Sequence, residues 1–241
     1  MNGKKVYVAL TQFCNFDPRP RRMLQDAGFI ISENTSGKRP TVAQLFEALG
    51  GVDAVIAGVE SYPASLLAQL SQLCCISRCG AGTDAVDLEE ARRRNIAVLT
   101  TPGAVIEPVA QMAVGMILAL ARNFPLHLRD MSKGLWKKPA GHLLSEWTIG
   151  LVGFGRVGRA VERYLRVFNT RITVYDPNVP QGDLPENVTS SDLPGLLRSC
   201  DLVSLHVSRT PQEGPVLGRQ EIFSMKKGRR LVNTARGYLV D

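Results

Sequence analysis

Residues 148–176 restrict the fold most, because a short apolar run leads through three spaced glycines into a helical pattern and then into a second apolar run. The glycines are Gly153, Gly155 and Gly158, in a Gly-x-Gly-x-x-Gly arrangement. In such a unit the first glycine permits a tight turn, the second lets the backbone approach a pyrophosphate, and the third lets the helix pack closely on its strand. The helix N-terminus then presents free N–H groups and a partial positive charge to the phosphates. This segment predicts a strand, turn, helix and strand that hold a dinucleotide.

The second apolar run ends in Asp176, which lies 18 residues after Gly158. A carboxylate at this place accepts hydrogen bonds from the ribose hydroxyls and repels a 2′-phosphate, so we predict NAD rather than NADP. Two plainer interpretations remain open. The glycines could form a turn that merely joins a strand to a helix, and Asp176 could initiate a turn before Pro177. The order of strand, helix, second strand and acid favours dinucleotide binding.

Short apolar runs alternate with helical patterns along the rest of the chain, which is typical of a parallel sheet covered by helices. In a first series we expect strands at residues 5–10, 29–32, 53–57, 73–77 and 96–99, with helices at 20–27, 41–49, 63–71 and 88–94. In a second series we expect strands at 148–152, 171–175, near 188, at 201–206 and at 230–233. The chain is therefore predicted to be an α/β protein with one domain over residues 1–101 and another over 102–241.

An apolar stretch at residues 109–121 joins the two series. It is shorter than the roughly 20 residues that a bilayer requires, and it contains Gln111, so we expect a buried helix with Pro108 in its first turn. Residues 126–145, around Trp136, lack clear periodicity, and we expect an irregular arm there. The N-terminus lacks the apolar segment and cleavage site of a secretory signal. A cytoplasmic protein without a membrane partner is the expectation.

Composition narrows the function further. With 44% hydrophobic and 21% charged residues the chain can bury a substantial core. The five cysteines lack the paired spacing of a zinc site, so we expect no metal. Most of the net charge of +7 falls in residues 101–241, which contain 18 basic and 12 acidic side chains. Because these are scattered among helices without an RNA- or DNA-binding motif, we expect a solvated surface and no nucleic-acid partner.

Several motifs together resemble the family of NAD-dependent D-2-hydroxyacid dehydrogenases, which includes phosphoglycerate dehydrogenase. They are residues 78–88 (Arg-Cys-Gly-Ala-Gly-Thr-Asp-Ala-Val-Asp-Leu), 101–103 (Thr-Pro-Gly), 153–158 with 175–177 (Tyr-Asp-Pro), and 233–237 (Asn-Thr-Ala-Arg-Gly). The resemblance implies two doubly wound parallel-sheet domains, a flavodoxin-like substrate domain and a Rossmann dinucleotide-binding domain. It also implies an oxidoreductase that transfers a hydride between NAD and a small D-2-hydroxy acid or 2-oxo acid.

The resemblance assigns substrate contacts to two places. Gly80, Ala81 and Gly82 resemble the loop whose N–H groups receive the substrate carboxylate, and glycines can aim successive N–H groups into one anion-binding concavity. Without the resemblance this loop reads as an ordinary strand-to-helix turn. Arg236 resembles the catalytic arginine, whose planar fork can hold a carboxylate and polarise the reacting carbonyl. A surface salt-bridge arginine is the alternative.

Further cofactor contacts are implied at the ends of strands. Arg156 and Val157 open the helix of the glycine motif, while Thr234 and Ala235 would lie along the nicotinamide side. His206 and Val207 resemble the position at which the chain passes the cofactor. A histidine whose hydrogen bonds are satisfied at a strand end is the competing interpretation of His206.

The sequence also departs from the family pattern. Hydride transfer at a hydroxyl carbon needs a group that takes the hydroxyl proton, and the family uses a histidine, oriented by a glutamate, beyond the arginine motif. The three histidines, His127, His142 and His206, all precede Arg236, and the sequence stops at Asp241. We therefore expect a domain that is incomplete at its C-terminus and a chain that is inactive as given.

The sequence also departs from the family pattern at two single positions. Ser208 stands where the family commonly has the proline of His-x-Pro, and Gln111 replaces an acid often found in the helix after Thr-Pro-Gly. The missing histidine motivates the alternative of a non-catalytic, NAD(H)-responsive binding protein that resembles the corepressors of the same family. The resemblance also implies a homodimer, with the arm around Trp136 as the candidate contact.

Overall fold

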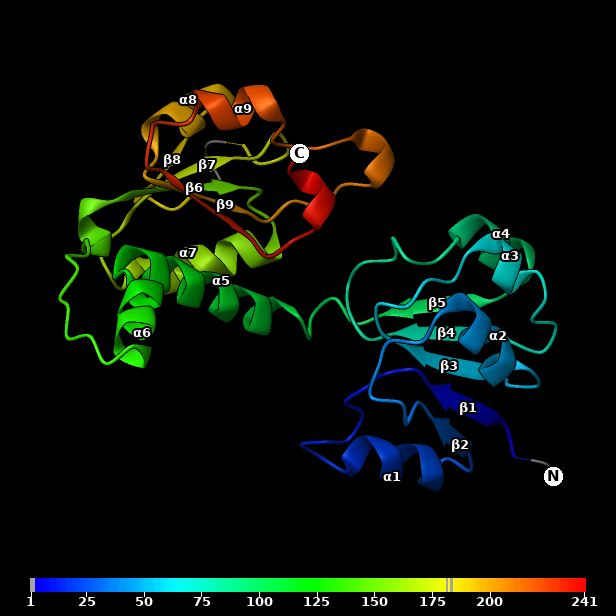
Figure 1. The fold of residues 1–241 in the computed structure, drawn as a ribbon. Coiled ribbons are helices and arrows are strands. Elements are labelled where there is room, and N and C mark those ends of the chain that lie inside the picture. The colour runs from blue at the N-terminus through cyan, green and yellow to red at the C-terminus, as the bar shows by residue number, and fades with distance from the viewer. Residues whose placement is uncertain (1–2, 181, 183) are drawn as a thin grey trace. The chain divides into compact units, whose positions relative to one another are not determined.

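The computed structural model describes residues 3–180, 182 and 184–241, and the chain divides into two compact units, Met1–Val105 and Ile106–Asp241. Among the described residues of the first unit, five parallel strands form one sheet in the order β2-β1-β3-β4-β5 (Figure 1). The strands are β1 (Lys5–Val8), β2 (Ile30–Glu33), β3 (Ala54–Ala57), β4 (Cys75–Arg78) and β5 (Ala97–Thr100). The helices are α1 (Arg19–Asp26), α2 (Val42–Leu49), α3 (Ala64–Leu67) and α4 (Leu88–Arg93).

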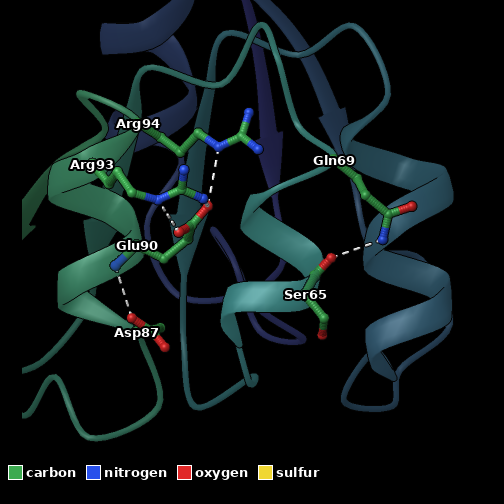
Figure 2. A network of polar contacts seen from close by, with 6 residues as sticks. All are labelled: Ser65, Gln69, Asp87, Glu90, Arg93 and Arg94. Atoms are coloured by element: carbon green, nitrogen blue, oxygen red, sulfur yellow. Dashed lines mark hydrogen bonds and ion pairs between the residues drawn. The ribbon is translucent and has the colours of Figure 1, made fainter.

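Side-chain capping explains where α2 and α4 begin. Thr41 and Gln44 form a capping box at the start of α2. Asp87 caps α4 by accepting the Glu90 N–H at 2.8 Å (Figure 2). The buried Glu90 carboxylate in turn accepts hydrogen bonds from two arginines at the end of the helix, Arg93 and Arg94. These bonds fix the helix that directly follows the loop at residues 79–86.

The second unit contains another parallel sheet, which in the described residues has the order β10-β9-β6-β7-β8. Its strands are β6 (Thr148–Val152), β7 (Arg171–Tyr175), β8 (Val188–Ser190), β9 (Leu202–Leu205) and β10 (Arg230–Asn233). Its helices are α5 (Ile106–Ala121), α6 (Phe124–Ser132), α7 (Arg156–Arg166), α8 (Leu193–Ser199) and α9 (Arg219–Ser224). Because β7 follows β6 on one side while β9 lies on its other side, the strand order reverses at β6. Ligands of open α/β sheets bind beyond the carboxyl ends of the strands at such a point.

Helices cover both faces of this second sheet. Figure 1 shows α5 and α7 on one face and α8 and α9 on the other. The buried side chains of α5, which include Ala113 and Ile117, pack in one core cluster with Ile149 and Leu151 of β6. The prediction of a buried helix over the apolar stretch is therefore confirmed. The predicted α/β class is also confirmed, since both units are parallel sheets with helical connections.

The prediction of an irregular arm over residues 126–145 is wrong for residues 126–132. Residues 124–132 form α6, which begins after Asn123 in the left-handed conformation and has Pro125 in its first turn. Several of its apolar side chains are exposed, among them Leu128 and Met131, so they form no buried stripe from which a helical period could be read. The short α9 was not predicted either, because six residues carry too little periodic signal.

In the part of the chain that the structure describes, no single helix is long and apolar enough to cross a membrane. The helices α5 and α6 meet that test only as a pair that is bent by 68°.

Candidate functional site

The glycine loop between β6 and α7 has three glycines under different constraints. Gly153 has φ +96, and a Cβ there would lie 2.7 Å from the carbonyl carbon of His206, so no other residue fits. Gly158 is buried, and a Cβ there would overlap the carbonyl oxygen of Gly153. At Gly155 a Cβ would meet nothing within 4 Å. The first and third glycines are therefore required by the protein itself, whereas the second keeps an open space.

That open space lies at the N-terminus of α7. Gly155 is the N-cap residue and offers no side chain to cap the helix. The first N–H groups of a helix have no partner within it, and the helix dipole adds a partial positive charge. Arg156 is exposed at the first position of the helix, and Val157 packs against the core. A cradle that a Cβ would fill, combined with donors and positive charge, fits the pyrophosphate of a dinucleotide.

Asp176 faces this loop from the end of β7. One carboxylate oxygen accepts the Phe154 N–H at 2.7 Å, and the other accepts the Asn178 N–H at 2.9 Å. The bond from the Asn178 N–H belongs to a turn at Asp176, as expected if this residue initiates a turn before Pro177. The bond from the Phe154 N–H also connects Asp176 to the glycine loop. A carboxylate oxygen has two acceptor directions, so Asp176 can still accept bonds from ribose hydroxyls.

The next strands bring His206 and Thr234 to the same edge of the sheet. In the parallel register Leu205 pairs with Asn233, so the two residues follow their strands side by side. Both ring nitrogens of His206 and the hydroxyl of Thr234 are buried and, among the described residues, have no hydrogen-bond partner. Burial lowers the pKa of His206 to about 4, which leaves the ring neutral at pH 7. No described protein group satisfies the His206 ring, so its nitrogens and the Thr234 hydroxyl can form hydrogen bonds with a bound ligand.

Val207 continues this edge, and its side chain approaches Gly153. A turn fixes the residues after β10, because the Asn233 side chain accepts the Ala235 N–H at 3.0 Å and donates to the Arg236 carbonyl at 2.7 Å. Arg236 is half-buried, and its Nη1 donates to the Ala235 carbonyl at 3.0 Å. Sequence reasoning missed this bracing role of Asn233, although asparagine at a strand end is a common turn former.

The loop at residues 80–82 belongs to the first unit and follows β4. Gly80 is buried with φ +145, and its N–H donates to the Thr101 hydroxyl at 2.9 Å. The Thr101 N–H returns a bond to the Gly80 carbonyl. Ala81 is exposed and Gly82 half-buried. Of the three N–H groups expected to receive a carboxylate, that of Gly80 is thus used inside the unit.

The structure brings most of the expected cofactor residues together at the carboxyl edge of the second sheet. The glycine loop, Asp176, His206 and Thr234 follow four strands that are neighbours in the order β10-β9-β6-β7. The arrangement can hold an anionic group at the helix N-terminus and a polar group beside buried donors and acceptors.

Comparison with known proteins agrees with this geometry. The sequence profile described as "D-isomer specific 2-hydroxyacid dehydrogenase, NAD binding domain" matches residues 114–241. Hydroxypyruvate reductase of Thermotoga maritima is 36% identical over 201 residues, which cover 82% of this chain and 65% of that protein. Human D-3-phosphoglycerate dehydrogenase is 32% identical, and the match covers 100% of this chain and 44% of that protein. Glyoxylate reductase of Thermofilum pendens is also 32% identical, and the match covers 100% of this chain and 73% of that protein. The chain thus spans less than two thirds of the first two relatives.

Solved structures show the same fold. The TT0316 protein from Thermus thermophilus has a TM-score of 0.84 at 31% identity, over 98% of this chain and 75% of that one. D-lactate dehydrogenase from Aquifex aeolicus, solved with NAD and lactic acid, has a TM-score of 0.82 at 27% identity, over 99% and 71%. The likeness extends over nearly all of the chain.

Proposed function

The chain belongs to the D-isomer specific 2-hydroxyacid dehydrogenase family, and from this premise we propose that the protein transfers a hydride between NAD and a small 2-hydroxy or 2-oxo acid. Its second unit is the NAD-binding domain of the family. The observation that carries the proposal is the open cradle at Gly155, which lies between two glycines that the fold requires and is faced by Asp176. Bound NAD supplies the hydride acceptor.

Different residues of the second unit bind different parts of NAD. Gly153, Gly155 and Gly158, with Arg156 and Val157, hold the pyrophosphate at the N-terminus of α7. The Asp176 carboxylate accepts the ribose hydroxyls and repels a 2′-phosphate. The buried polar atoms of His206 and Thr234, together with Val207 and Ala235, accommodate the nicotinamide end.

Two places would bind the substrate. The guanidinium of Arg236 holds the carboxylate of the acid and polarises its carbonyl, because its planar fork matches a carboxylate. The loop of Gly80, Ala81 and Gly82 receives a carboxylate through N–H groups, and Ala81 and Gly82 carry this role because the Gly80 N–H is bonded to Thr101. The names of the relatives suggest hydroxypyruvate, glyoxylate and phosphohydroxypyruvate as substrates to test.

We further propose that the 241-residue chain binds NADH without turnover. A proton donor and acceptor should have a pKa near the working pH, whereas burial lowers the pKa of His206 to about 4. His127 and His142 precede the glycine loop, on α6 and just before residues 144–146. His206 therefore stands at the cofactor edge without a proton to exchange at pH 7. His142 lies beside Trp147, which precedes β6 and so belongs to the opposite end of that strand.

One experiment tests both statements. NADH is titrated by its fluorescence, and its oxidation is followed with glyoxylate, pyruvate, hydroxypyruvate and 3-phosphohydroxypyruvate, in the 241-residue chain and in the product of the complete reading frame. We expect micromolar NADH binding by the 241-residue chain and NADH oxidation only where a proton-exchanging group follows Arg236. A chain that fails to bind NADH contradicts the cofactor site. A product of the complete reading frame that binds NADH but oxidises it with no 2-oxo acid points instead to an NAD-responsive binding protein.

We also propose a homodimer that forms through α6 and the segment after it. Phe124, Leu128, Met131 and Trp136 are large, apolar and exposed there, and such groups mark interaction surfaces. Light scattering should give twice the chain mass, and Trp136→Ser should shift the mass toward the monomer. Phe16→Ser, which removes an exposed aromatic ring from the first unit, is the matched control and should leave the mass unchanged.

A further inference from the structure

Unsatisfied polar atoms of the first unit gather beside one loop. Within the described part of this unit, two buried side-chain atoms lack a hydrogen-bond partner, and these are Arg78 Nε and the Tyr62 hydroxyl. Arg78 ends β4 and immediately precedes the loop at residues 80–82. Tyr62 is bonded to the segment after that loop, since its N–H donates to the Ala85 carbonyl at 2.7 Å and its carbonyl accepts the Asp87 N–H at 3.0 Å. Both unsatisfied atoms thus belong to residues that border the loop.

The guanidinium of Arg78 lies against the loop. The side chain is buried at 6% exposure, and its Nη1 donates to the Cys79 carbonyl at 2.9 Å. A Cβ on Gly80 would lie 3.0 Å from that nitrogen, and φ +145 at Gly80 excludes other residues as well. Glycine therefore lets the charged group sit directly beneath the loop backbone.

No carboxylate in the described part of the chain forms an ion pair within 4.0 Å with this buried charge of Arg78. The buried carboxylate of Glu60 accepts the Gly58 N–H at 2.6 Å instead. Tyr62 lies in the field of both charges: its pKa is raised by burial and by Glu60, and Arg78 opposes the rise. Burying a charge without a partner is costly, so stability alone does not account for Arg78.

We propose that Arg78 is a positioning residue that supplies the positive charge of the loop at residues 80–82, and that its counter-ion is the carboxylate of the 2-oxo acid substrate. The inference rests on the proposed function. Ala81 and Gly82 donate the direct hydrogen bonds, and Arg78 acts through the loop by its charge and by its bond to the Cys79 carbonyl. A charge in such a low-dielectric place attracts an anion more strongly than one in water.

The test uses oxalate, an unreactive dicarboxylate analogue of a 2-oxo acid, titrated calorimetrically into the whole chain with saturating NADH. Arg78→Met should weaken oxalate binding by tenfold or more, whereas Arg78→Lys, which keeps the charge, should weaken it by about threefold or less. NADH affinity should not change. Arg92→Met, which removes an exposed arginine of α4, is the control for net charge and should bind oxalate like the original chain.

A second readout separates this role from a purely structural one. The amide resonances of Ala81 and Gly82 should shift when oxalate binds, and Arg78→Met should abolish the shift. Its melting temperature should hold or rise, because methionine of similar volume replaces a buried unpaired charge. Unchanged oxalate affinity in Arg78→Met overturns the proposal, as does an original chain that binds no oxalate. The proposal is also overturned if Arg78→Met and Arg78→Lys both lose oxalate affinity and both melt at a lower temperature, because the role of Arg78 would then be structural. Failure of the chain to bind NADH, measured separately by fluorescence titration, instead refutes the proposed function.

Discussion

Replacing Gly155 by alanine should separate cofactor binding from folding. The residue has φ −73 and ψ −157, an extended conformation that alanine also adopts, and its added methyl group would meet nothing within 4 Å. Alanine restricts the unfolded chain, so the free energy of unfolding should stay the same or rise by up to about 1 kcal/mol. The substitution should therefore be silent in the absence of NADH.

The same methyl group would fill the space left for the pyrophosphate. A phosphate oxygen accepts backbone N–H groups at about 2.9 Å, and a Cβ in the cradle prevents that approach. Losing two hydrogen bonds to a charged group, at about 1.5 kcal/mol each, removes about 3 kcal/mol. This difference corresponds to roughly a 100-fold rise in the NADH dissociation constant.

Gly158→Ala provides the contrast, because its Cβ would overlap the Gly153 carbonyl oxygen, which belongs to the backbone and cannot rotate away. Such overpacking costs about 1–3 kcal/mol, so this variant should lose stability even without NADH. Urea unfolding with and without NADH, combined with NADH fluorescence titration, measures both quantities. The reasoning is refuted if Gly155→Ala binds NADH as tightly as the original chain, or if it unfolds as readily as Gly158→Ala.

Two other substitutions test the same edge of the sheet. Asp176→Ala should weaken NADH binding by roughly tenfold and raise the ratio of NADPH to NADH affinity, because the carboxylate that repels the 2′-phosphate is gone; an unchanged ratio in parallel titrations removes Asp176 from ribose recognition. His206→Asn should reduce the loss of stability that the original chain shows as the pH falls from 6.5 to 4. In this range the histidine of the unfolded chain binds a proton, whereas the buried ring of the folded chain, with its pKa of about 4, does not. The free energy of unfolding of the original chain should therefore fall by up to about 3 kcal/mol. Melting curves of both chains across this range decide the point.

The sequence predicted most accurately the strands whose carboxyl end is marked by a turn-forming residue. The bounds of β6, β7 and β10 agree with the expectation, because apolar runs that face helices are sharply bounded by glycine, aspartate or asparagine. At the edge strand β2 the prediction is shifted by one residue, since exposed and half-buried side chains alternate there and mark no clear end. The helix α6 was missed because its apolar side chains lie on the surface, so their spacing indicates no core.

For the candidate site, the sequence predicted which residue types take part, but it did not predict the hydrogen bonds between them. Three glycines and an acid at set spacings pointed to the cradle, and the structure shows why two of the glycines cannot be replaced. The bond from the Phe154 N–H to Asp176 and the bond from the Gly80 N–H to Thr101 join residues 22 and 21 positions apart. Such pairs depend on strand register, which a single sequence does not reveal. The burial of Arg78 was hidden for the same reason, because an arginine before a glycine-rich loop also suits an exposed turn.

His206 should contribute to cofactor binding as a neutral group, and the pH dependence of NADH affinity can show it. Burial disfavours the charged ring, and among the described residues neither ring nitrogen has a partner that could offset this cost. A neutral imidazole has one donor and one acceptor, which suits an amide group such as the carboxamide of nicotinamide. NADH affinity should therefore be constant from pH 5.5 to pH 8. A change in affinity with a midpoint near 6.5, present in the original chain and absent in His206→Asn, would show that the ring ionises in this range and would contradict the neutral role.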